Sequence, residues 1–212
     1  MTHTAAVFAH CAAAPSIVVR RIFSGEYDMA ESRIGYIDIY GNAKDGYVGG
    51  VLVTDRIGVP VEFRHTENVN PGKLQKILYG RSLERFLKCE SLAKCLLSDL
   101  ENKPDILIVP DPEYFLLTRA FSFPFVQISR AAKEPLTQHG EVQEISESEI
   151  ILQVLSLREP LRVKVDRKNA PTLASVKTLL LDLGRTMDLL EPMSRVQEAL
   201  KEILGDMTRL VK

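Results

Sequence analysis

Between Tyr36 and Ser129 the apolar positions change their spacing several times, and each spacing predicts a different element. Three runs rich in β-branched and aromatic residues come first, separated by short connectors with turn residues. Short turns join strands that pair antiparallel, so these runs predict a three-strand meander. The runs are residues 36–40, 47–54 and 59–65, and a possible further strand, residues 16–23, precedes them.

Helical spacing follows the meander, from an Asn-Pro pair that opens a helix to about Glu101. The apolar face changes sides at Gly80, so we expect a break there. Asp105–Val109 is apolar without alternation, which is typical of a strand covered on both faces. A short helix over residues 112–119 and a second buried strand over 123–129 complete the series. The predicted core of these strands is Ile106, Ile108, Phe125 and Val126.

The strand–helix–strand–helix–strand order requires crossover connections, which favour parallel pairing. Over roughly residues 34–130 the order β-β-β-α-β-α-β resembles the ribonuclease H-like core, and a longin or roadblock-like α/β layer is the alternative. The fold class we predict is α/β: three antiparallel strands, then helix-strand-helix-strand, plus a C-terminal hairpin and two helices. Around the 34–130 core we expect an N-terminal arm (1–33), a linker or loop (131–149), and a β-hairpin with a helical tail (150–212).

The last forty residues carry two apolar stripes on either side of Pro192. In each stripe the apolar positions step by three and four residues, the spacing of a helical seam. We expect two helices, with Pro192 in the first turn of the second and Gly184 allowing an early end to the first. Each stripe can pack on the chain's own sheet or on another chain. The candidate interface residues are Leu173, Val176, Leu180, Leu183, Met187, Met193, Val196, Leu200, Ile203 and Met207.

The resemblance to the ribonuclease H-like core also implies candidate catalytic residues. In nucleases of that class, carboxylates in the first strand, on the first helix and after the fourth strand hold two divalent metals. Asp38, Glu84 and Asp111 occupy those places here. The simpler interpretation is that Asp38 lies on a half-exposed strand face between two tyrosines. Asp111, followed by proline, is equally common at a turn or helix entry.

Composition restricts the partners and the compartment. The net charge is −1, so no overall field draws the chain onto nucleic acid. Three cysteines do not suggest a disulfide framework, which favours a reducing, cytoplasmic setting. No apolar run reaches the length of a membrane span. We interpret the modest basic clusters as solvated faces: Arg20 and Arg21; Lys73, Lys76, Arg81 and Arg85; Arg162, Lys164, Arg167 and Lys168.

No strong catalytic motif accompanies this pattern, since the chain lacks both a nucleophile elbow and a phosphate loop. Our leading hypothesis is a non-enzymatic assembly or adaptor subunit of a larger cytoplasmic protein complex. It would dock through its C-terminal helices on a protein partner or on itself, with no cofactor, no membrane and no nucleic acid. One alternative is a ribonuclease H-like nuclease that uses Mg²⁺. The other is a small-ligand regulatory domain that uses a gap beside Gly49 and Gly50.

Overall fold

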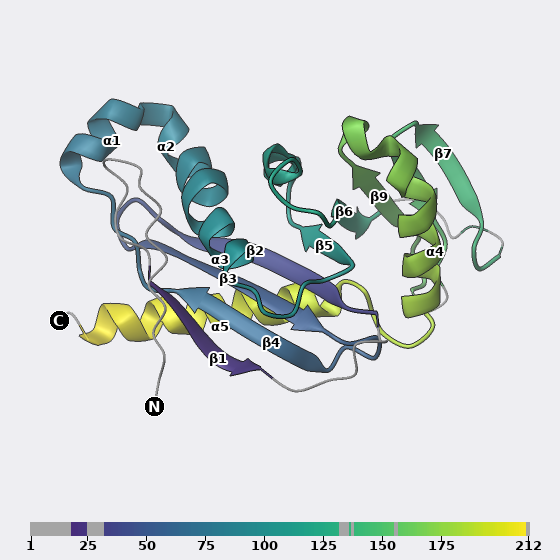
Figure 1. Ribbon diagram of the computed structural model, residues 1–212, viewed down its shortest axis with the longest axis horizontal. Helices are drawn as coiled ribbons and strands as arrows, with labels where there is room; N and C mark the ends of the chain where they lie inside the picture. The colour runs from purple at the N-terminus through teal and green to yellow at the C-terminus, as the bar shows by residue number, and fades with distance from the viewer. Residues whose placement is uncertain (1–17, 25–31, 132–135, 137, 155–156, 211–212) are drawn as a thin grey trace.

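In the computed structural model, all nine strands of the described chain form one sheet, in the order β1-β4-β3-β2-β5-β6-β9-β8-β7 (Figure 1). The structure describes residues 18–210 apart from 25–31, 132–135, 137 and 155–156. The strands are β1 (Val19–Ser24), β2 (Ile34–Asn42), β3 (Gly46–Thr54), β4 (Pro60–Thr66), β5 (Ile106–Val109), β6 (Phe125–Arg130), β7 (Val142–Ser146), β8 (Glu149–Leu152) and β9 (Leu161–Val165). No helix among the described residues is long and apolar enough to cross a membrane.

The centre of the sheet has the connectivity that the sequence predicts. Strands β2, β3 and β4 form the antiparallel meander. Strand β5 then pairs parallel to β2, with Tyr36 opposite Ile108, and β6 pairs parallel to β5. Helical segments connect the meander to β5 and β5 to β6, so the ribonuclease H-like order is confirmed over residues 34–130. The predicted core is confirmed as well, because Ile106, Ile108, Phe125 and Val126 are all buried.

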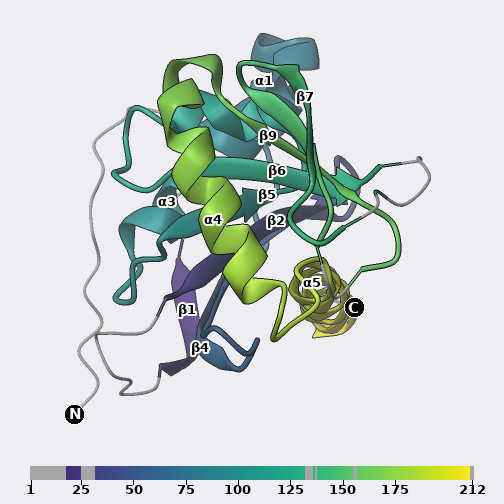
Figure 2. The same ribbon diagram turned by 90° about the vertical axis from the view of Figure 1, so that its right-hand side faces the viewer.

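Helices cover both faces of the sheet (Figures 1 and 2). One face carries the crossover segments between β4 and β5 and between β5 and β6, and the other carries the C-terminal helices. The crossover segments are α1 (Lys73–Tyr79), η1 (Gly80–Ser82), α2 (Leu83–Arg85), η2 (Phe86–Ala93), α3 (Lys94–Ser98) and η3 (Pro112–Leu117). After β9 come η4 (Arg167–Thr172), α4 (Leu173–Leu183) and α5 (Glu191–Leu210). The expected break at Gly80 and the end of the first C-terminal helix at Gly184 are both present.

The two C-terminal stripes pack on the sheet of their own chain. Val196 and Leu200 of α5 are fully buried, and Val176 and Leu180 of α4 belong to the same apolar core. Gly50 of β3 lets α5 approach closely, because a Cβ at this position would lie 2.9 Å from Cδ2 of Leu200. Of the residues nominated as an interface, the structure places all ten in this core or against it.

The glycine pair of β3 does not line a gap. A Cβ at Gly49 would lie 2.9 Å from Cδ1 of Leu96, which approaches from α3 on the face opposite α5. Leucines from two helices therefore fill the space on both sides of this strand, and the glycines are needed because the helices come so near. The small-ligand hypothesis, which placed a binding gap beside Gly49 and Gly50, is corrected by this packing.

The C-terminal hairpin enlarges the same sheet. Strands β8 and β9 pair antiparallel, as expected, and β9 also pairs with β6. Part of the expected linker, Val142–Ser146, forms strand β7 at the edge of the sheet. Its residues are exposed or only partly buried, so the segment lacks the apolar alternation from which a strand can be predicted.

Replacing Ile108 by Ala is expected to lower the free energy of unfolding by about 2–5 kcal/mol. Ile108 lies on a central strand and is buried among residues of the core beneath α5, so truncation removes apolar contacts and leaves a cavity. Urea denaturation of the wild type and the variant measures the difference. Ile57, which is exposed between β3 and β4, gives the matched control: Ile57→Ala should change stability by less than about 0.5 kcal/mol. A loss below about 1 kcal/mol for Ile108→Ala would show that β5 is not central.

Candidate active site

Two carboxylates lie where the parallel pairing of β2 with β5 ends, Asp38 in the middle of β2 and Asp111 just after β5. Tyr36 lies opposite Ile108 in the register of this pair, so Asp38 lies level with Pro110, two residues further along. Asp111 follows at once, at the start of η3. Carboxyl ends of neighbouring parallel strands share one edge of the sheet, which is where α/β proteins commonly place their sites. The adjacency of β2 and β5 in the sheet therefore accounts for the predicted convergence of Asp38 and Asp111.

Asp38 is half-buried and has two hydrogen-bond donors. The backbone N–H of Ile39 donates to its Oδ1 at 2.7 Å, and Nε2 of Gln197 on α5 donates to its Oδ2 at 2.8 Å. Burial raises the pKa of Asp38 above its usual value, although both hydrogen bonds oppose the shift. The negative charge of Asp111 raises the pKa of Asp38 further.

Asp111 caps the short helix that follows it. Its Oδ1 accepts a hydrogen bond of 2.8 Å from the backbone N–H of Glu113, and proline takes the first helical position. From the neighbouring strand β6, Nε2 of Gln127 donates to the carbonyl oxygen of Pro110 at 3.2 Å. Asp111 therefore fulfils the helix-entry role that the simpler interpretation gave it. The same contacts fix its carboxylate at the edge of the sheet, beside Asp38.

A lysine accompanies the two carboxylates. Lys88 lies on η2, which is wound as a π-helix, a form often found at functional sites. Its Nζ lies 3.3 Å from Oε1 of Glu84, and its side chain is 24% exposed. Burial alone would lower the pKa of Lys88, but the ion pair with Glu84 and the charges of Asp111 and Glu113 raise it. The ammonium group thus stays charged within an acidic neighbourhood.

Glu84 does not join the aspartates as a third ligand of the kind the sequence suggested. It is exposed and forms its ion pair with Lys88 instead. Among the described residues, no three acidic, cysteine or histidine side chains lie close enough to hold a metal ion together. Mg²⁺ is nonetheless often held by only one or two carboxylates, with water and substrate phosphate completing its shell. A pair of carboxylates such as Asp38 and Asp111 would suffice for one such ion, shared with a phosphate.

Tyr114 is a further candidate residue that was not predicted from the sequence. This residue of η3 is fully buried, and its hydroxyl has no hydrogen-bond partner among the described residues. Burial raises its pKa well above the usual value, and the charges of Asp38 and Asp111 add to the shift. A buried, unpaired hydroxyl is costly, so the O–H of Tyr114 near the two carboxylates calls for a functional explanation. The sequence could not reveal it, because an aromatic residue in a short helix also fits a purely structural role.

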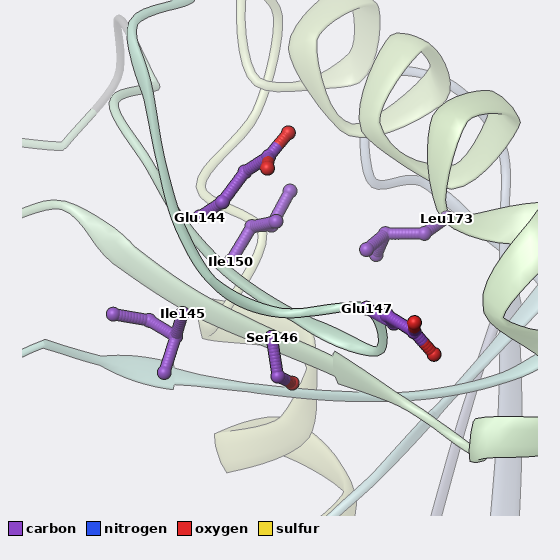
Figure 3. A pocket seen from close by; sticks show the side chains of 6 residues that line it. All are labelled: Glu144, Ile145, Ser146, Glu147, Ile150 and Leu173. Carbon is purple, nitrogen blue, oxygen red and sulfur yellow. The ribbon is translucent and has the colours of Figure 1, made fainter.

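A hollow lies at the β7 end of the sheet order, around the β7–β8 turn (Figure 3). Its lining includes two acidic side chains, Glu144 and Glu147, which extend in different directions in the close-up. The remaining lining residues are small or apolar and offer no catalytic group. We therefore place the candidate active site at Asp38 and Asp111.

Replacing Lys88 by Met is expected to tighten the binding of Mn²⁺ to the free protein about fivefold to tenfold. The substitution removes a positive charge near the carboxylates but keeps most of the side-chain volume, and the repulsion at stake is about 1 kcal/mol. Isothermal titration calorimetry measures the affinity. Lys94→Met, at an exposed position further along the same crossover segment, is the control and should leave the affinity unchanged. If the wild type and Lys88→Met bind Mn²⁺ with equal affinity, Lys88 does not lie near the metal site.

The molecule belongs to the class of mixed α/β proteins with a ribonuclease H-like fold. It carries one carboxylate on the central strand β2 and another just after the neighbouring strand β5. Two solved structures that share this fold are of Ciona intestinalis endonuclease V, each in complex with DNA containing an inosine followed by a ribo-adenosine. The one with a 23mer DNA is 14% identical and has a TM-score of 0.53, covering 88% of this chain and 92% of that chain. The one with a 24mer is 13% identical, with a TM-score of 0.51, and covers 84% and 88%. No protein-family model and no curated protein matches the sequence.

The comparisons and the packing together correct two predictions. The hypothesis of a non-enzymatic adaptor is wrong, because most of the chain shares its fold with endonuclease V, a nuclease, and the supposed docking helices are part of the intramolecular core. The expectation of a protein partner without nucleic acid is contradicted as well, because both Ciona structures hold DNA. The balanced net charge misled the prediction, because it says nothing about where the charges lie.

Proposed function

We propose that this protein is a divalent-metal-dependent nuclease that hydrolyses phosphodiester bonds of nucleic acid at Asp38 and Asp111. The observation that carries the proposal is the placement of Asp38, in the middle of β2, level with the end of the parallel strand β5 that Asp111 follows, in the central part of a ribonuclease H-like sheet. The similarity to DNA-bound endonuclease V structures supports nucleic acid as the substrate. The nuclease alternative from the sequence thus becomes the main hypothesis.

The residues around the pair have distinct roles in this reaction. Asp38 and Asp111 would hold Mg²⁺, which supplies charge neutralisation at the phosphate and lowers the pKa of attacking water. Gln197 fixes the orientation of Asp38 by its hydrogen bond from α5. The ammonium group of Lys88 offsets negative charge where the phosphate would enter. Tyr114 can donate a hydrogen bond without adding charge.

Cleavage of short labelled nucleic acids by the purified protein tests the proposal. Single-stranded DNA, duplex DNA, RNA and DNA with one ribonucleotide should be incubated with Mg²⁺, Mn²⁺ or EDTA, with the protein in excess. We expect at least one substrate to be cut with metal and none with EDTA. The rate should fall on acidification at a higher pH than for an ordinary aspartate, because the raised pKa of Asp38 lets protons displace the metal sooner. Failure to cut any of them with either metal would contradict the proposal.

A further inference from the structure

Helix α1 exposes an apolar face that no described residue covers. Leu74, Ile77 and Leu78 are 66%, 67% and 72% exposed, the largest values among the exposed large apolar side chains. Their spacing places them on one side of the helix, as the sequence pattern suggested. In Figure 1, α1 and α2 extend above the sheet, away from the strands. A contiguous exposed apolar surface of this kind marks a binding site more often than a lone exposed leucine does.

The segment that carries this face, residues 73–85, is strongly basic. It contains four basic side chains and one acidic side chain, in a chain whose net charge is −1. Lys73, Arg81 and Arg85 are exposed and form no ion pair with any described residue. The single acidic residue, Glu84, is paired with Lys88. We call residues 73–85 the basic arm.

The basic arm is anchored at the same edge of the sheet as the candidate active site. Nζ of Lys76 donates to the carbonyl oxygen of Ala43 at 2.7 Å, in the turn that follows β2, the strand of Asp38. The rings of Tyr79 and Phe86 pack with centroids 4.5 Å apart and join α1 to η2. The arm is therefore attached at the end of β2 that follows Asp38 along the strand.

We propose that the basic arm holds substrate nucleic acid beside the active site, with its exposed apolar face against unpaired bases and its basic side chains on phosphates. The inference rests on the proposed function and specifies the class of substrate. Aliphatic side chains reach the faces of bases only where pairing or stacking is interrupted. The preferred substrate is therefore a nucleic acid with unpaired or unstacked nucleotides next to the cleaved bond.

The charge of the basic arm favours nucleic acid over another protein as its binding partner. An apolar face that docks another protein has no need of uncompensated basic residues around it. Here Lys73 precedes the face in the sequence, Arg81 and Arg85 follow it, and all three lack ion-pair partners among the described residues, which is complementary to a phosphate backbone. Neutralising phosphates with such side chains also predicts a marked dependence of binding on salt.

Fluorescence anisotropy tests the inference, with all proteins carrying Asp38→Asn so that binding is measured without cleavage. The apolar variant is Leu74→Ser, Ile77→Ser and Leu78→Ser together. It should bind a gapped duplex or single strand at least about tenfold more weakly, and a fully paired duplex less than about twofold more weakly. The matched control is Ile57→Ser with Val59→Ser, two exposed apolar residues between β3 and β4 at the opposite edge of the sheet. The control should bind like its parent.

The basic variant, Lys73→Ala, Arg81→Ala and Arg85→Ala, tests the phosphate contacts separately. The slope of log affinity against log salt should become shallower by about 2, since each lost contact removes roughly 0.7 to 0.9. Circular dichroism should show that all variants fold like their parent, and the single variant Leu78→Ser replaces the triple one if the triple variant does not fold.

Three results would count against the inference, and they are distinguishable from failure of the proposed function. If the parent binds nucleic acid and both arm variants bind equally well, the arm is not the contact surface, although the nuclease proposal stands. If the parent is a dimer by analytical ultracentrifugation and the apolar variant a monomer, the face is covered by a second copy of the chain. If the parent binds no nucleic acid and the wild type cuts none, the inference and the proposed function fall together.

Discussion

Replacing Leu200 by Glu should unfold the protein or leave it only marginally stable. Leu200 is fully buried between α5 and the sheet, where it lies against Gly50 at close van der Waals distance. A carboxylate at this position would lose its water without gaining a partner, and it would replace apolar contacts as well. The cost is several kcal/mol, a large share of the roughly 5–15 kcal/mol that stabilises a domain. Thermal and urea denaturation followed by circular dichroism measures it.

Lys201→Glu, one residue further along α5, is the matched control for this variant. Lys201 is exposed, so the substitution introduces the same carboxylate on the solvent side of the helix and should change stability by less than about 0.5 kcal/mol. The adaptor hypothesis required the opposite outcome for Leu200, namely loss of a partner from a folded domain. A Leu200→Glu protein that melts like the wild type would show that α5 does not pack on the sheet.

Asp38→Asn and Asp111→Asn are each expected to reduce the cleavage rate about a thousandfold, which corresponds to roughly 4 kcal/mol of transition-state stabilisation. The amide keeps the size of the side chain but removes the charge that holds the metal. Single-turnover cleavage of the best substrate, at saturating Mg²⁺, measures the loss. Asp182→Asn, an exposed carboxylate on α4, should retain the wild-type rate. Activity that survives in both Asp38→Asn and Asp111→Asn would locate the catalytic site elsewhere.

The same substitution at Asp38 should not weaken the fold. A carboxyl group whose pKa is raised in the folded state binds its proton more tightly there than in the unfolded chain. Its contribution to stability is therefore present at low pH and is lost as the pH rises through the raised pKa. At neutral pH the ionised carboxylate is unfavourable, so Asp38→Asn should melt at or above the wild-type temperature. Lost activity with unchanged or increased stability is the signature of a functional carboxylate.

The parts of the site that follow from the order of strands could be predicted from the sequence, whereas those that depend on tertiary packing could not. The order of apolar runs predicts the meander, the crossovers and the adjacency of β2 and β5, so Asp38 and Asp111 could be paired before any coordinates. The position of Lys88 could not be predicted, because the crossover becomes a π-helix from Phe86. In a π-helix the side chains point in different directions from those in an α-helix. Tyr114 was missed because its importance comes from burial beside the carboxylates.

The C-terminal helices show a different limit. A repeat of apolar residues in steps of three and four predicts a helix with one buried stripe, but it does not say what covers that stripe. Gly50 indicates what covers the stripe of α5, since a glycine in the middle of a strand can mark the close approach of another element. The sequence offered a ligand gap as one interpretation of this glycine, whereas the structure shows that Leu200 fills the space.

The binding of Mn²⁺ tests the central claim most directly, because it reports on the metal site itself rather than on a reaction rate. Mn²⁺ would be titrated by calorimetry into the wild type, Asp38→Asn and Asp111→Asn, each alone and saturated with the tightest-binding oligonucleotide. In that oligonucleotide a methylene group replaces the bridging ester oxygen at the cut site, which prevents cleavage and keeps both non-bridging phosphate oxygens. We predict about one metal-binding event in the wild type that is tightened by the oligonucleotide and is absent in both variants. Equal binding in all three proteins, or none in the wild type, would contradict a metal site at Asp38 and Asp111.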